Sequence, residues 1–102
     1  MSVKRRDVAM VSNEYEDYSD SVLYDVFYEA GTMLGGWLSS RQVAALKKGN
    51  HALADRYEQE RFELDEERSR VGAHDRAAQI AMIKKWHVRR VELDSSELLV
   101  AM

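Results

Sequence analysis

Apolar side chains recur every three or four positions over residues 20–36, which is the spacing of one face of an α-helix. The stripe consists of Val22, Val26, Ala30, Met33 and Trp37. Larger side chains widen it on one flank, namely Leu23, Phe27 and Leu34. Ser19 and Asp20 are good N-cap residues, and Gly35-Gly36 is a helix-ending pair. Because the apolar face is broader than one neighbour could cover, we expect residues 20–36 to form the central core helix.

A second, shorter helix is predicted over residues 40–48. Ser39 and Gln42 have the spacing of a capping box, in which a hydroxyl and an amide satisfy backbone N–H groups reciprocally. Gly49 is suited to end this helix, and Asn50 is suited to cap the next one.

Residues 51–71 predict one long helix with a narrow apolar seam. The seam consists of Leu53, Tyr57, Leu64 and Val71, with Phe62 to one side. The stretch YEQERFELDEERSR, residues 57–70, is otherwise mostly charged, and opposite charges stand three or four positions apart. Each such pair adds only about 0.2–0.5 kcal/mol to a helix. The pairs are Arg56–Glu60, Glu58–Arg61, Arg61–Asp65, Asp65–Arg68 and Glu66–Arg70. The pattern is typical of a hairpin arm or a coiled-coil strand.

The last predicted helix covers residues 75–93, after a break at Gly72 and with Asp75 at its N-terminus. Its apolar edges hold Ile80, Ile83, His87 and Val91, and next to them Met82, Trp86 and Leu93. We expect this helix to fold back on 51–71 as an antiparallel hairpin packed on 20–36. The fold class is then all-α, with about four helices, a mobile N-terminal arm (1–18) and a C-terminal tail (94–102). The tail is one more helical turn or a flexible end.

The composition fits a single small domain. The chain has 102 residues, of which 45% are hydrophobic and 32% charged, with a net charge of −3. It has no proline, which favours long helices, and no cysteine, which excludes disulfides and thiolate chemistry. No apolar run reaches the roughly 18 residues that a membrane helix needs, and the start resembles no signal peptide. We therefore expect a cytoplasmic protein.

Catalytic and metal-binding patterns are weak. The acidic residues Glu60, Glu63, Glu66 and Glu67 alternate with arginines, and the chain contains no Glu-x-x-His motif. The three histidines, His51, His74 and His87, are too scattered for a zinc site. No nucleophile elbow and no glycine-rich phosphate loop occurs. We expect no enzyme, no metal and no cofactor, and we interpret the acidic run as a solvated helix face.

The broad apolar faces of residues 20–36 and 75–93 predict association with a protein partner or, as a homodimer, with a second copy. Aromatic and methionine side chains are the preferred anchors of such interfaces. The predicted contacts are Tyr24, Tyr28, Trp37, Met82 and Trp86. The favoured function is a non-enzymatic interaction or regulatory protein, such as an inhibitor or an antitoxin-like factor.

A DNA-binding regulator is the alternative. The cluster KKWHVRR, residues 84–90, offers Lys84, Lys85, Arg89 and Arg90 to phosphates. Residues 38–58, LSSRQVAALKKGNHALADRYE, resemble the helix-turn-helix of repressor-type DNA-binding domains, although the turn glycine stands at Gly49 instead of one position earlier. This resemblance implies that Asn50, His51 and Arg56 would face the DNA groove.

Residues 60–86, ERFELDEERSRVGAHDRAAQIAMIKKW, carry a second resemblance. The segment is similar to small, mostly helical proteins of actinobacteria and their phages. The shared features are an Arg/Glu arm, a glycine or proline break, and an apolar helix that ends in tryptophan. The resemblance implies an interaction or regulatory role and brings no catalytic residues with it.

Overall fold

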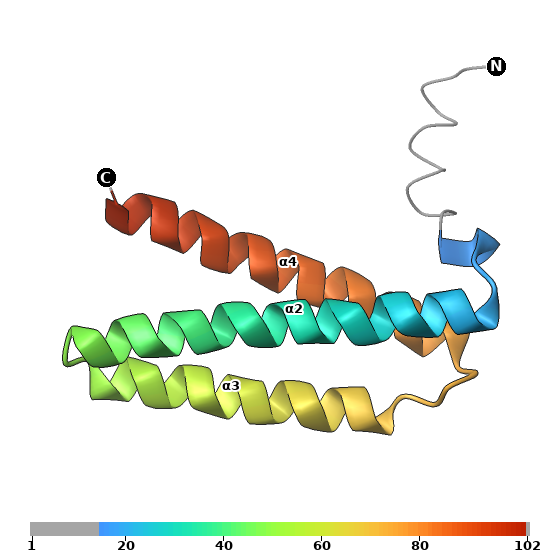
Figure 1. Cartoon of the computed structure of the whole chain (residues 1–102), viewed down its shortest axis with the longest axis horizontal. Coiled ribbons are helices and arrows are strands. Elements are labelled where there is room, and N and C mark those ends of the chain that lie inside the picture. Colours follow the sequence, from blue (N-terminus) through green and yellow to red (C-terminus); the bar gives the residue numbers. More distant parts are fainter. Residues whose placement is uncertain (1–14, 102) are drawn as a thin grey trace, which may run out of the picture.

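The computed structural model describes the backbone of residues 15–101 and the side chains of residues 15–95. One short 3-10 turn precedes three long α-helices (Figure 1). The elements are η1 (Tyr15–Asp17), α2 (Asp20–Lys47), α3 (His51–Arg70) and α4 (Arg76–Ala101). The described residues contain no strand, so the predicted all-α class is confirmed. Residues 1–14 of the predicted N-terminal arm lie outside the described residues.

Helix α2 is the central element of the fold. Helix α3 runs antiparallel along one side of it, and α4 returns along the other side and diverges from α2 towards its own C-terminal end (Figure 1). Both outer helices therefore pack mainly on α2. The direct hairpin predicted for residues 51–71 and 75–93 stays a prediction, because α3 and α4 meet chiefly through the charged side chains described below.

The predicted break at Gly35-Gly36 is wrong, and the helices expected at 20–36 and 40–48 form the single helix α2. Both glycines keep negative φ angles, since Gly49 alone among the described glycines has a positive φ, of 75°. A Cβ at Gly35 would lie 3.7 Å from Cδ2 of Leu64, so this glycine faces α3 at ordinary packing distance. Tertiary packing along the whole of α2 outweighs the low helix propensity of the two glycines.

Helix ends follow the predicted caps more closely. The side chains of Ser19 and Asn50 accept hydrogen bonds from Val22 N (3.3 Å) and Leu53 N (3.2 Å), which satisfies N–H groups at the starts of α2 and α3. The positive φ of Gly49 allows the tight turn between these helices. Helix α4 extends to Ala101 and not to residue 93, so the described part of the predicted tail is helical.

The core lies on the face of α2 that α3 and α4 share. Its buried members from the three helices are Leu23, Phe27, Leu34, Leu38, Leu64, Ile80, Ile83, Trp86 and Leu93. The rings of Phe27 and Trp86 are stacked with centroids 5.4 Å apart. Gly31 is buried between the outer helices, because a Cβ there would lie 3.1 Å from Cδ of Arg68 and 3.2 Å from Cζ3 of Trp86.

The stripe that the sequence predicts as the centre of the buried face of α2 lies at the border of that face. Val22 and Met33 are each 45% exposed, whereas Leu23 and Leu34, one position further on, are almost completely buried. Leu and Phe side chains fill the space between the three helices, whereas Val26, Ala30 and Trp37 of the predicted stripe pack at the border of the core, and Val22 and Met33 are exposed.

Arg76 fastens the start of α4 to the start of α2. Its guanidinium donates to Oδ1 of Asp20 at 2.8 Å and to the carbonyl oxygens of Tyr15 and Glu16, both at 3.1 Å. These three hydrogen bonds hold η1 and the first turns of α2 and α4 together at one end of the molecule.

Candidate functional site

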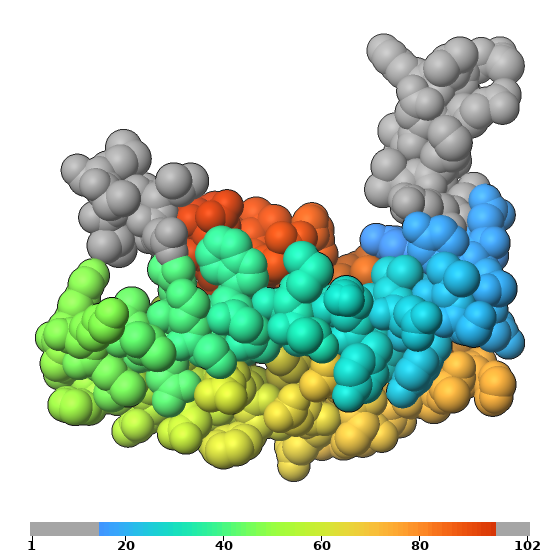
Figure 2. Space-filling model, in the orientation of Figure 1, coloured from blue at the N-terminus to red at the C-terminus, as the bar shows by residue number. Residues whose placement is uncertain are grey.

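One side of α2 is covered by neither α3 nor α4, and Figure 2 shows α2 crossing a whole face of the molecule. We call its stripe of residues the outer face of α2. It comprises Val22, Val26, Glu29, Met33, Gly36, Ser40, Val43 and Lys47, of which only Val26 is half-buried and the others are exposed. Val43 is 50% exposed, slightly more than Val22 and Met33. Its exposed apolar residues, Val22, Met33 and Val43, are separated along the stripe by polar, charged and glycine positions.

The centre of the outer face is hollowed. A shallow groove of about 320 Å³ is lined by Met33, Gly36, Trp37, Ser40 and Arg41. Gly36 leaves open space in this groove, since a Cβ built on it would meet no atom within 4 Å. The ring of Trp37 is half-buried and forms one border of the groove, with the guanidinium carbon of Arg41 5.6 Å from its centroid.

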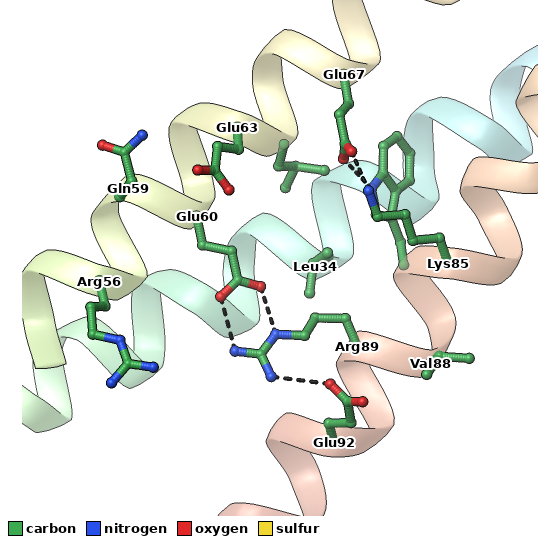
Figure 3. Close-up of a pocket in the computed structure, with 12 residues that line it drawn as sticks. Leu34, Arg56, Gln59, Glu60, Glu63, Glu67, Lys85, Val88, Arg89 and Glu92 are labelled. Carbon is green, nitrogen blue, oxygen red and sulfur yellow. Dashed lines mark hydrogen bonds and ion pairs between the residues drawn. The ribbon is translucent and has the colours of Figure 1, made fainter.

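A second hollow of about 530 Å³ lies between α3 and α4, over the buried face of α2 (Figure 3). Its floor is apolar and includes Leu34, Leu64 and Trp86. Charged side chains of α3 and α4 form its walls, and Figure 3 shows them reaching towards one another across the opening. We call this hollow the interhelical groove.

The walls of the interhelical groove are tied together by ion pairs. Arg89 donates two hydrogen bonds to Glu60, from Nε at 2.6 Å and from a terminal nitrogen at 2.9 Å, and a third to Glu92 at 3.1 Å. Lys85 pairs with Glu67, which also accepts a hydrogen bond from Nε1 of Trp86 at 3.3 Å. The hydrogen bonds to Glu60 raise the pKa of Arg89 above its ordinary value despite partial burial. The charges are thus compensated locally, and they brace α4 against α3.

The interhelical groove offers little chemistry. Its lining contains no serine, threonine, cysteine or histidine, and its one lysine, Lys85, is held in an ion pair with Glu67. Across the described residues, no group of three or more His, Asp and Glu side chains is placed to hold a metal ion. None of the described helices has both the length and the apolar character to span a bilayer. The groove is best explained as a braced joint between two helices.

The five predicted partner contacts do not form one surface. Tyr24 is half-buried, 5.8 Å from the ring of Phe27, and Met82 is half-buried against the core. Tyr28 is 49% exposed, and Trp86 is only 2% exposed and lies inside the core. Of the predicted contacts, Trp37 alone borders the outer face of α2. The role of all five as contacts stays a prediction, and the geometry favours Trp37 most.

The outer face itself was missed because Val22, Val26 and Met33 fit a core stripe. A signal was nevertheless present in the sequence. The same face of the helix carries Glu29, Gly36, Ser40 and Lys47. The neighbouring face instead carries large apolar residues, namely Leu23, Phe27, Leu34 and Leu38. A helix stripe that mixes valine and methionine with charged and small residues indicates a surface position.

The predicted nucleic-acid contacts lie on α3 and α4, and three of them, Arg56, Lys85 and Arg89, line the interhelical groove. Lys85 and Arg89 are paired with carboxylates of α3, and Asn50 is used as the N-cap of that helix. Lys84, His51 and Arg56 are exposed, and Arg90 lies 3.2 Å from Nδ1 of His87. Helices α2 and α3 are antiparallel neighbours (Figure 1), whereas a helix-turn-helix crosses at about 90–120°.

Comparison with protein families, with curated proteins and with solved structures gave no match for this chain.

Proposed function

We propose that this chain is a non-enzymatic protein-interaction protein, a small regulator of the inhibitor or antitoxin-like kind, that acts in the cytoplasm. It binds its partner through the outer face of α2. The close pairing of α3 with α4 as a helical hairpin belongs to the same proposal, since the ion pairs of the interhelical groove would hold that hairpin rigid behind the binding face.

One observation carries the proposal. The outer face runs along most of α2, and its members Val22, Met33 and Val43 are 45–50% exposed although buried positions on the same helix are well filled. Exposed apolar side chains that gather on one helix are the expected anchor of a helix-mediated interface. The resemblance of residues 60–86 to small helical proteins adds support for an interaction or regulatory role. DNA binding has no comparable support, because Lys85 and Arg89 are already paired.

Site-specific photo-crosslinking tests this function. A photoreactive amino acid at Val43 places the probe on the outer face, and the same residue at Phe62, which is 58% exposed on α3, is the matched control. We expect protein adducts from position 43 in the cells that produce the chain, and weak or no adducts from position 62. Equal labelling from both positions, or none from position 43, would contradict the proposal.

A further inference from the structure

We infer that the outer face of α2 binds the same face of a second copy, antiparallel, with the twofold axis midway between Met33 and Gly36. This inference rests on the proposed function and names its partner. The spacing of the outer face, its shape and its distribution of charge all fit such a pair.

The spacing of the outer face is that of a coiled-coil seam. Its residues follow one another in alternating steps of four and three along the whole of α2, from Val22 through Met33 and Gly36 to Lys47. A four–three repeat keeps one stripe of a helix facing a second helix over many turns. The buried face of α2 uses the same kind of repeat for α3 and α4, so the outer face has the pattern for one more helix and lacks that helix within the described chain.

The stripe is complementary to itself in the antiparallel direction. With the axis midway between Met33 and Gly36, Met33 of each copy lies opposite Gly36 of the other. The same alignment places Val26 opposite Val43 and Glu29 opposite Ser40. Met33 and Glu29 thus lie opposite the smaller residues Gly36 and Ser40. Val26 of each copy lies opposite Val43 of the other. An isologous interface requires this reciprocity, because one surface must fit itself.

No packing contact among the described residues explains Gly36, whereas such a pairing would. Glycine weakens a helix interior, and Gly31 and Gly35 compensate by admitting Arg68, Trp86 and Leu64 close to the backbone. Gly36 admits no neighbour, because a Cβ there would meet nothing within 4 Å. In the antiparallel pair it becomes the notch that receives the flexible side chain of Met33.

Charge selects the antiparallel direction. The N-terminal half of the exposed side of α2 carries Asp25 and Glu29, and its C-terminal end carries Lys47 and Lys48. Antiparallel pairing brings Lys47 opposite Val22, one helical turn from Asp25 of the second copy. Parallel pairing would place Glu29 opposite Glu29 and Lys47 opposite Lys47, which is repulsive.

Sedimentation equilibrium of the whole chain tests the interface. We expect a monomer–dimer equilibrium in which Met33→Lys raises the dimer Kd at least about tenfold, because each dimer buries two such charges. Phe62→Lys places the same charge on an exposed apolar site of α3 and should change Kd by less than about twofold. Since Met33 is 45% exposed, both variants should retain the helical circular-dichroism spectrum of the parent.

Thiol crosslinking tests the direction, and it is unambiguous because the natural chain has no cysteine. A short bis-maleimide should join Val22→Cys to Lys47→Cys when the two variants are mixed. Neither variant alone should give a crosslinked dimer, since the antiparallel pair places identical ends about 37 Å apart at 1.5 Å per residue. Crosslinking of Lys47→Cys to itself would show a parallel pair and overturn the inference.

The remaining outcomes separate this inference from the proposed function. A chain that stays monomeric at all accessible concentrations, but whose position 43 labels a different protein, overturns self-association and leaves the proposed function standing. A dimer that Met33→Lys leaves intact and Phe62→Lys dissociates overturns the assignment of the interface to α2.

Discussion

The guanidinium carbon of Arg68 lies 4.3 Å from the centre of the Tyr28 ring. The same guanidinium donates hydrogen bonds to the Tyr28 carbonyl oxygen at 3.2 Å and to Oγ1 of Thr32 at 3.1 Å. It also pairs with Asp65 at 3.3 Å, and its aliphatic stem covers Gly31. One side chain of α3 therefore fills the notch at Gly31 and holds α3 against α2. Tyr28, although half exposed, serves as its platform.

We expect Arg68→Ala to lower the free energy of unfolding by about 1–2 kcal/mol, because it removes the cation–π contact, two hydrogen bonds to α2 and the packing over Gly31. Arg70→Ala is the matched control, since Arg70 is 71% exposed and forms an ion pair at 3.6 Å with Glu66, which is also exposed. The control should cost less than about 0.5 kcal/mol. Urea unfolding followed by circular dichroism measures both, and equal losses would contradict the role assigned to Arg68.

The pair of Arg89 and Glu60 should show measurable coupling in a double-mutant cycle. Both side chains are about one-third exposed, so we expect a coupling of about 1 kcal/mol and not the larger value of a fully buried pair. The exposed pair Arg70 and Glu66 should give less than about 0.5 kcal/mol. A result in which the two cycles agree would show that the interhelical groove is not braced by its charges.

The coupling energy between Arg89 and Glu60 should not change between about pH 7 and about pH 9, because Arg89 stays protonated throughout this range. Its hydrogen bonds to Glu60 raise the pKa of Arg89 in the folded chain above its ordinary value, which already lies well above this pH range. The stabilisation that follows from a raised pKa is fully present below the unfolded value and is lost only as the pH rises through the folded one. Repeating the cycle at both ends of this range tests this independence, and a coupling that changed would contradict it.

Two glycines of α2 should respond oppositely to alanine. Gly36→Ala should raise the free energy of unfolding of the monomer by about 0.5–1 kcal/mol, because the methyl group meets no atom and restricts the unfolded chain. Gly31→Ala should lower it by about 1 kcal/mol or more, since the new Cβ would press on Arg68 and on the stacked ring of Trp86. Thermal unfolding at a concentration where the parent is monomeric gives the comparison, and the reverse order would refute it.

The two tryptophans should differ in solvent access. Trp86 is 2% exposed, whereas Trp37 is half-buried beside the outer face. In Trp37→Phe only Trp86 emits, and we expect blue-shifted fluorescence with weak acrylamide quenching. In Trp86→Phe only Trp37 emits, and we expect stronger quenching, which should fall at high protein concentration if the outer face is covered by a second copy. Comparable quenching in the two variants would contradict the burial of Trp86.

Local patterns predicted those features that local interactions decide. The caps Ser19 and Asn50, the turn at Gly49 and the narrow seam at Leu64 depend on neighbours in the sequence, and all are present. The predicted break at Gly35-Gly36 is wrong because packing against α3, which is distant in sequence, stabilises the helix across these two glycines.

The charged residues of α3 show a different limit. Glu60 has Arg56 one turn away, and the sequence pairs them, yet the structure pairs Glu60 with Arg89 of α4. Arg61 likewise bonds to Gln42 of α2 at 3.1 Å instead of to Asp65 or Glu58. A helix face that is exposed to solvent and one that forms ion pairs with another helix can have the same charged residues. Only the position of α4 shows which of the two the charged face of α3 is.

The tight turn at Gly49 has a kinetic consequence. Contacts between α2 and α3 begin next to this turn and move outward, from Gln42 with Arg61 to Tyr28 with Arg68, so each closes only a short additional loop after the one before it. The contacts of α4 with the start of α2, such as Arg76 with Asp20, span more than half of the chain. Contacts between residues close in sequence form rapidly. We therefore expect α2 and α3 to pack together first. The docking of α4 should be the slower step that completes the native state.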